Sequence, residues 1–262
     1  MKRRNFLAGL GPLTIAPLMS DASVLSPKAE EGQYLEWIKY TLPTGSNKNR
    51  VEKYYESVGV QALNSLGIAD IGVFNVMYGP NEPSLYVLIP HNNLESAMNY
   101  QDRLLDNRSY VEAAGDFLDS SISNPAYVRV ERSLMKAFAG MPKVESALQS
   151  VGEQRVLELR IYESHNYIKG QKKIDMFNNA GEIQIFRDTG LTPVFFGETV
   201  FGQLMPNLTY MLAFKDMAER DKNWNTFRYS EGWAKIKDLE EYKDTVSNIT
   251  DIILRPAKCS QV

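Results

Sequence analysis

The stretch LELRIYES, residues 157–164, alternates apolar and polar side chains over its first six positions. Two leucines and an isoleucine alternate with a glutamate, an arginine and a tyrosine. Successive side chains of a β-strand point to opposite faces, so the pattern predicts a strand with one apolar and one polar face. What that polar face contacts depends on the elements that the rest of the chain places around it.

This strand has a counterpart earlier in the chain. YLEWIKYTLP from Tyr34 aligns with VLELRIYESH from Val156, and the sequence after Gly79 aligns with the sequence after Gly202. A single offset of about 123 residues serves for most of the alignment, which indicates a repeated unit. We therefore expect two domains, residues 30–140 and 155–262, joined by a linker.

Both halves predict the same order of elements. Each opens with a strand, at 33–42 or 155–163, and continues with a helix that ends near a glycine. A hairpin, a second helical stretch and a short closing strand follow. The hairpin and closing strands are expected at residues 71–77, 85–89, 127–130, 194–201, 208–214 and 251–254.

The order β-α-β-β-α-β is the ferredoxin-like arrangement, in which helices cover one face of an antiparallel sheet. The predicted fold class is therefore α+β, with two tandem ferredoxin-like domains. The second face of each sheet must also be buried, so we expect the two sheets to form an α+β barrel. Residues 141–154 have the composition of the linker between the domains.

Several of these stretches together resemble the NIPSNAP family of dimeric α+β-barrel proteins. They are the E-L-R-x-Y pattern from Glu158, the hairpin VFFGETVFG…LTYMLAF and the segment FRYSEGWAKIKD. The second half matches closely and the first half more loosely, since Trp37 and Ile38 stand where the second half has Leu159 and Arg160. The resemblance implies that the two halves of one chain form a pseudo-dimer. It also allows several chains to assemble into a homo-oligomer.

What this resemblance implies about function is limited, because most NIPSNAP-like proteins have no defined reaction. One expectation is a module that binds a small molecule or a partner without catalysis. The alternative is a cofactor-independent monooxygenase or isomerase acting on a small aromatic or carbonyl compound inside the barrel. Structurally similar relatives include such monooxygenases, muconolactone isomerases and haem-binding chlorite dismutase-like proteins, and fold alone does not choose among them.

The polar face of the 157–164 strand supplies the candidate catalytic residues. If the apolar face packs on the helices, Glu158, Arg160 and Tyr162 point into the barrel, where low dielectric shifts pKa values. Glu158 would be a general base, Arg160 would stabilise an enolate, and Tyr162 or His165 would orient the substrate. The competing interpretation is an internal Glu–Arg ion pair with the tyrosine as packing.

Aromatic and polar residues elsewhere are candidate ligand contacts. They are Glu36, Trp37, Tyr40, Phe196 and Trp233. Aromatic residues at such spacings can line a pocket for a planar ligand, but they are more often ordinary core.

We expect no metal and no cofactor. The two histidines, His91 and His165, are isolated from each other and from cysteine, which is a weak metal signal. Each of the two is expected to be a surface or loop-anchoring histidine. The single Cys259 excludes an intrachain disulfide. The net charge of −3, with both signs mixed along the chain, gives no case for nucleic-acid binding.

The first 25 residues are typical of an export signal. Lys2, Arg3 and Arg4 precede a short apolar stretch, and RRNFL resembles a twin-arginine motif. The alternative is a basic tail on a cytoplasmic protein. We expect export, with a periplasmic location and no membrane association after signal removal, since no later run is apolar enough to span a bilayer.

Overall fold

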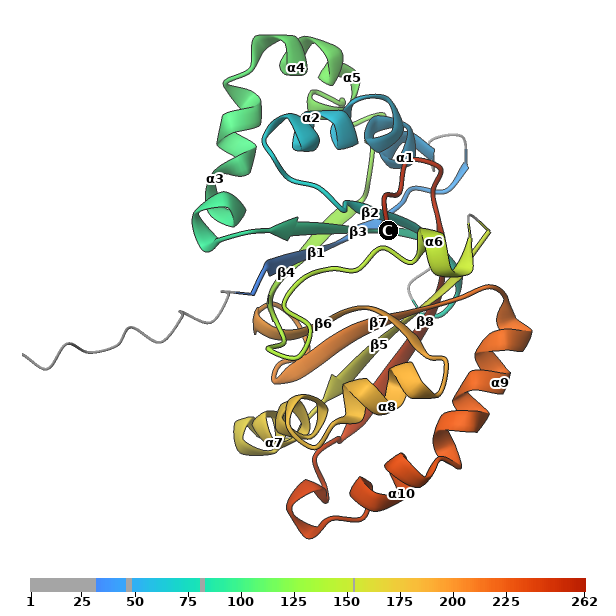
Figure 1. The fold of residues 1–262 in the computed structure, drawn as a ribbon. Coiled ribbons are helices and arrows are strands. Elements are labelled where there is room, and N and C mark those ends of the chain that lie inside the picture. Colours follow the sequence, from blue (N-terminus) through green and yellow to red (C-terminus); the bar gives the residue numbers. More distant parts are fainter. Residues whose placement is uncertain (1–31, 46–48, 81–82, 153) are drawn as a thin grey trace, which may run out of the picture.

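The computed structural model describes residues 32–45, 49–80, 83–152 and 154–262. Its strands form one closed barrel with helices on the outside (Figure 1). The signal-like segment 1–25 lies outside the described residues.

The elements of the two halves follow each other in a similar order. The first half contains β1 (Tyr34–Thr41), α1 (Arg50–Tyr54), the π-helix η2 (Tyr55–Gly59), α2 (Val60–Ser65), β2 (Gly72–Tyr78), β3 (Ser84–His91), α3 (Leu94–Leu105), α4 (Arg108–Ala113), α5 (Gly115–Leu118) and β4 (Arg129–Ala137). After α6 (Leu148–Val151), the second half contains β5 (Val156–Glu163), α7 (Tyr167–Asn178), α8 (Glu182–Asp188), β6 (Thr192–Phe201), β7 (Asn207–Phe214), α9 (Met217–Arg228), α10 (Glu231–Ile236), the 3₁₀ turn η3 (Glu240–Tyr242) and β8 (Asn248–Pro256).

The barrel closes because each half completes the sheet of the other. Within a half the strand order is β4-β1-β3-β2 or β8-β5-β7-β6. The last strand of each half then pairs antiparallel with the other half, β4 with β6 and β8 with β2. Both joints contain a register shift, which lets a strand bend as a sheet curves. The predicted α+β barrel is confirmed.

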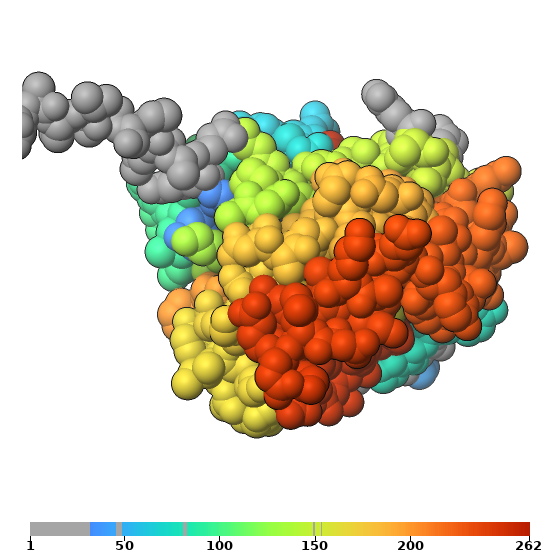
Figure 2. Space-filling view, turned by 60° about the horizontal axis from the view of Figure 1, so that its bottom comes forward, coloured from blue at the N-terminus to red at the C-terminus, as the bar shows by residue number. Residues whose placement is uncertain are grey.

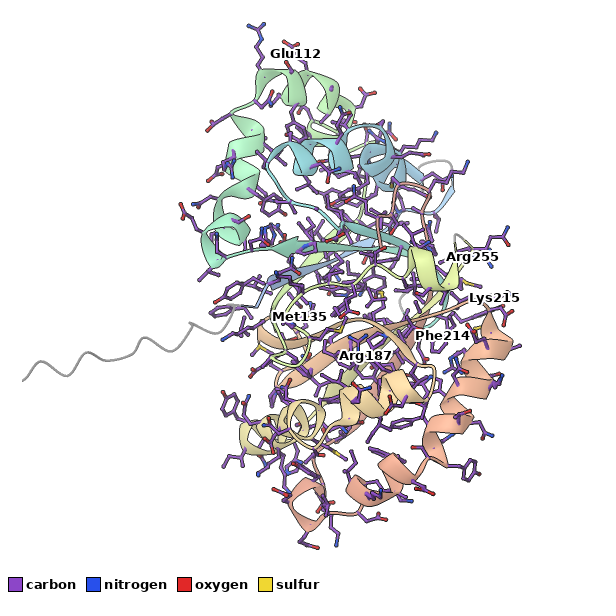
Figure 3. The ribbon with its side chains drawn as sticks, in the orientation of Figure 1. Glu112, Met135, Arg187, Phe214, Lys215 and Arg255 are labelled. Carbon is purple, nitrogen blue, oxygen red and sulfur yellow. The ribbon has the colours of Figure 1, made fainter. Side chains whose placement is uncertain are left out.

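The barrel interior is a hydrophobic core to which all eight strands contribute. Alternate side chains of each strand point inward, as the pleat requires. Its buried members are Leu35, Trp37, Phe74, Tyr86, Leu88, Met135, Ala137, Val144, Ala147, Leu157, Leu159, Val194, Phe195, Met211, Ala213, Ile252, Leu254 and Val262. Met135 is labelled in Figure 3, between the two helical layers.

Two further cores lie outside the barrel, between its strands and the helices. Helices α1 to α5 cover the first half and α7 to α10 the second (Figure 1). Figure 2 shows the second set, yellow to red, as one continuous surface over its strands. Within the described ranges, no helix combines the length and apolar character needed to cross a membrane.

Helix ends are fixed by local signals that occur in both halves. Gly67 and Gly190 both have φ of +82° after a helix, a conformation that favours glycine at a C-terminal cap. Asn93 and Asp216 cap α3 and α9, each accepting a hydrogen bond from the backbone N–H three residues later.

One predicted strand was placed too early. The closing strand of the first half was expected at 127–130, whereas β4 runs from Arg129 to Ala137. Arg129, Glu131 and Arg132 interrupt the apolar pattern there, and β4 is held by pairing with β1 on one side and β6 on the other.

One end of the barrel is closed by segments that follow the last strand of each half. In the segment 141–152, expected as a linker, Val144 and Ala147 are buried in the barrel core. Val262 joins the same core, and the buried Arg155 donates to its carbonyl oxygen. The cavity that reaches the barrel interior lies at the opposite end.

Truncating an inward leucine should destabilise the whole barrel. Leu159 is fully buried, so Leu159→Ala should lower the free energy of unfolding by about 2–5 kcal/mol through lost burial and a cavity. Ile122→Ala, at a fully exposed position, should change it by less than about 0.5 kcal/mol. Urea unfolding followed by circular dichroism measures both, and equal effects would contradict the burial of Leu159.

Candidate functional site

A cavity of about 270 Å³ occupies the open end of the barrel. Its lining comes from β1, β3, β4, β5, β6, β7 and β8 and from the β2–β3 and β6–β7 connections. We call it the barrel-mouth cavity. Its lining residues are Trp37, Lys39, Pro80, Tyr86, Glu131, Ser133, Met135, Ile161, Thr199, Gln203, Leu204, Asn207, Thr209, Thr250 and Ile252.

The wall of this cavity toward the barrel core is aromatic and aliphatic. Trp37 stacks on Tyr86 with ring centroids 5.2 Å apart and planes 19° apart. Met135, Ile161 and Ile252 add aliphatic surface. A flat apolar group that enters the mouth therefore meets a rigid aromatic pair.

The rim of the cavity is polar but its charges are compensated. Lys39 Nζ lies 2.6 Å from Glu131 Oε2, and Gln203 donates to Glu131 Oε1 at 2.8 Å. On the adjoining strands β6 and β7, Thr199 and Thr209 both donate to Asn207 Oδ1, at 2.7 and 3.2 Å. These contacts fix the rim residues before any ligand arrives, and the paired charges favour a neutral ligand over a charged one.

The expectation that Glu158, Arg160 and Tyr162 point into the barrel was wrong. Leu157 and Leu159 fill the barrel interior instead, so the polar face of β5 lies under the helices of the second half. The physical reason is volume. The inside of an eight-stranded barrel is filled by side chains, and branched aliphatic residues fill it without leaving polar groups unpaired.

Glu158 is nevertheless fully buried, and both of its oxygens are occupied. Trp224 Nε1 donates to Oε2 at 2.6 Å, and Arg220 Nη2 donates to Oε1 at 2.6 Å. Arg160 lies 3.8 Å from Oε1, stacks over Trp224 at 4.5 Å and pairs with Asp251 at 2.8 Å. The sequence-predicted acid and base are thus brought together, as part of an internal network.

Tyr162 belongs to the same layer. It accepts a hydrogen bond from Tyr210 at 2.9 Å, and burial raises the pKa of Tyr162 to about 12. Close by, a buried ion pair joins Lys173 Nζ to Glu182 Oε2 at 2.7 Å. Burial raises the pKa of Glu182, against the opposing effect of Lys173. His165, the fourth catalytic candidate, lies exposed between β5 and α7.

Glu36 has the corresponding place in the first half, also between the sheet and the helices. It pairs with Arg132 of β4, and its second oxygen lies 3.7 Å from His91 Nε2. His91 is completely buried and its Nδ1 lies 3.0 Å from Ser96 Oγ, which ties β3 to the first turn of α3. Arg132 also donates to Tyr100 at 2.5 Å.

The five predicted ligand contacts separate into two environments. Trp37 alone lines the barrel-mouth cavity. Tyr40 and Phe196 belong to the cores under the helices, and Trp233 packs against the second of these cores. Sequence reasoning missed the polar rim, because threonine, serine and asparagine on alternate strand positions also occur on ordinary solvent-facing strands.

No metal centre emerges from the geometry. Among residues 32–45, 49–80, 83–152 and 154–262, no three histidine, cysteine, aspartate or glutamate side chains converge as a metal site requires.

Replacing Glu158 tests the internal-network interpretation. Glu158→Gln removes the charge that Arg220 pairs with and puts an amide N–H₂ where one oxygen accepts, so stability should fall by about 1–3 kcal/mol. The exposed Glu241→Gln should change stability by less than about 0.5 kcal/mol. Urea unfolding provides the comparison, and an unchanged stability in Glu158→Gln would count against this interpretation.

Residues 157–261 match the NIPSNAP family model. No curated protein sequence matches the chain. Among solved structures, a candidate monooxygenase from Fusobacterium nucleatum has a TM-score of 0.56 at 9% identity, covering 87% of this chain and 94% of that one. A candidate monooxygenase from Lactobacillus acidophilus has a TM-score of 0.53 at 11% identity, covering 87% and 95%. An uncharacterised NIPSNAP-like domain protein from Burkholderia xenovorans has a TM-score of 0.37 at 16% identity, covering 40% and 88%. At these identities, the two structures with TM-scores above 0.5 are similar to this chain in fold.

Proposed function

We propose that this protein binds a small neutral molecule with a flat apolar body in the barrel-mouth cavity. The observation that carries the proposal is a cavity of about 270 Å³ at one end of the barrel, next to the packed core of its described strands. Concave sites with apolar walls and a few fixed polar groups are the usual form of small-molecule sites.

The chemistry of the lining defines the ligand. The Trp37–Tyr86 stack suits a ring of one or two fused units, and the hydroxyl groups of Ser133 and Thr250 offer hydrogen bonds to polar substituents. Lys39 and Glu131 neutralise each other, so a charged ligand would gain little from either.

The alternative, a cofactor-independent monooxygenase or isomerase, gains support from the two similar folds named as candidate monooxygenases. The geometry does not favour Glu158 as its general base, since both carboxylate oxygens already accept strong hydrogen bonds beneath α9. Turnover of a ligand bound at the barrel mouth would nevertheless establish the enzymatic alternative.

A binding experiment with 2-naphthol tests the barrel-mouth site. The chain has three tryptophans, and only Trp37 lines the cavity, so 2-naphthol should shift one of three indole N–H signals in an NMR titration. Thr250→Phe, which fills the cavity, should weaken binding at least about tenfold, equivalent to 1.4 kcal/mol. Thr250→Ser, which leaves the space open, is the matched control. An unshifted Trp37 signal, or unchanged affinity in Thr250→Phe, contradicts the proposal.

We also infer that the whole chain is a tandem NIPSNAP-type repeat whose halves form an intrachain pseudo-dimer. The family model covers the second half, and matching glycines and helix caps 123 residues apart, such as Gly67 and Gly190, support the same unit in the first. Pairing between pseudo-dimers into a homo-oligomer stays a proposal of the same kind.

Export through a twin-arginine route is proposed from the sequence of residues 1–25. The paired Arg3 and Arg4 before a short apolar stretch support it. Substituting both with lysine in the full chain should move the protein from the periplasmic to the cytoplasmic fraction of its bacterial host. Equal periplasmic recovery of both forms would contradict this route.

A further inference from the structure

A second cavity lies in the first half, between the helices and the outer face of the sheet. It has a volume of about 260 Å³, and five of its lining residues are tyrosines. They come from β1 (Tyr40), the α1–η2 junction (Tyr54 and Tyr55), α3 (Tyr100) and α4 (Tyr110). We call it the tyrosine cavity. It shares no lining residue with the barrel-mouth cavity, so it stands apart from the proposed function.

Two of these rings, Tyr54 and Tyr55, lie at an irregular helical turn. The π-helix η2 begins at Tyr55 and widens this turn. Such irregular turns are rare and occur frequently at functional sites.

Gly59 completes this arrangement. A Cβ atom at this position would lie 2.9 Å from a ring carbon of Tyr54 and 3.0 Å from one of Tyr55. Only glycine leaves room for both rings beside the wide turn. Tyr54 also stacks on Phe117, with centroids 3.9 Å apart and planes 8° apart, so its ring is held from both sides.

The tyrosine hydroxyl groups on the cavity wall form two hydrogen-bonded pairs, and each pair uses only one of its two hydroxyl protons. Tyr40 and Tyr55 lie 3.0 Å apart through their hydroxyl oxygens, and Tyr54 and Tyr110 lie 2.7 Å apart. In each pair one hydroxyl donates and the other, having accepted, keeps its own proton. Within the described residues no protein acceptor meets that second proton of either pair. Burial raises the pKa of Tyr40 to about 12, so this phenol stays protonated at neutral pH.

The second half shows what this space looks like when it is filled. Gln101, on the wall of the tyrosine cavity, lies 8 residues after Asn93, the N-cap of α3. Trp224 lies 8 residues after Asp216, the N-cap of α9, and its ring packs against Phe186 with centroids 5.8 Å apart. The smaller glutamine in α3 is thus one reason why the first half retains a cavity.

We propose that the tyrosine cavity is a binding site for a neutral, planar aromatic compound that carries hydrogen-bond acceptors such as carbonyl or ring-ether oxygens. The rings of Tyr54, Tyr55 and Phe117 supply an aromatic wall, and the two phenol pairs each present one proton to an acceptor. A ligand without acceptors leaves both protons unused, and an anion has no unpaired cation to meet among the residues that line the cavity.

Coumarin and naphthalene test this site in the full chain. Both are neutral two-ring compounds of similar size, but only coumarin carries acceptor oxygens. Isothermal titration calorimetry should show coumarin binding at least about fivefold tighter, as expected when a hydrogen bond worth about 1 kcal/mol is gained. Equal affinities, or no coumarin binding, overturn the proposal.

Two variants locate the binding. Tyr54→Phe combined with Tyr110→Phe removes a hydroxyl pair and keeps both rings, a change that should leave stability nearly intact because both partners are lost together. It should weaken coumarin about fivefold and leave naphthalene unaffected. Gln101→Trp, which copies the residue of the second half, should abolish the preference for coumarin over naphthalene.

Thr250→Phe is the control that separates this site from the proposed function. It fills the barrel mouth, so the preference for coumarin over naphthalene should stay unchanged while 2-naphthol binds at least about tenfold more weakly. Coumarin affinity that falls in Thr250→Phe and persists in Gln101→Trp would assign the binding to the barrel mouth and refute the tyrosine cavity. If 2-naphthol binds Thr250→Phe and Gln101→Trp as tightly as it binds the unmodified chain, the barrel-mouth proposal alone is refuted.

Discussion

Closure of the barrel is the constraint on which the rest of the structure depends. Each half has a four-stranded sheet with helices on one face, so the other face must be covered. Pairing β4 with β6 and β8 with β2 joins both sheets edge to edge and buries both bare faces against each other. Among the described strands, each has a hydrogen-bonded neighbour on both sides, so none forms an exposed sheet edge.

Closure also decides which face each strand residue points to: alternate residues point into the barrel, and those between them point toward the helices. In β5 the inward positions hold leucine and isoleucine, and the outward positions hold Glu158, Arg160 and Tyr162. Charged residues under a helical layer must be paired to be tolerated, and Glu158 is paired with Arg220 and Trp224. The same parity places Trp37 inside the barrel and its neighbour Glu36 outside, beside Arg132 and His91.

The order of elements and the fold class were predictable from the sequence. Periodicity and turn glycines such as Gly67 are local signals, and the constant offset between the halves shows that the same signals occur twice. The orientation of β5 was not, since its two faces are distinguished only by what packs against them. The alternating sequence pattern is identical whether the leucines pack against the helices or in the barrel interior. The tyrosine cavity was also beyond reach, because its walls come from β1, α3, α4 and a π-helical turn that lie far apart in the sequence. Of the five ligand contacts predicted from the sequence, the barrel-mouth cavity is lined by Trp37 and not by the other four.

The two halves share one architecture but differ in how the space between the sheet and the helices is packed. Under the second helical layer, rings from Phe177, Phe186, Phe227 and Trp224 meet at centroid distances of 4.8 to 5.8 Å, and the buried charges among them are paired. Under the first layer, Gln101 stands at the position of Trp224, and the tyrosine cavity remains between the helices and the sheet. Tight aromatic packing stabilises, whereas a cavity with spare donors lowers stability unless something fills it. A ligand that filled the tyrosine cavity would therefore stabilise the first half.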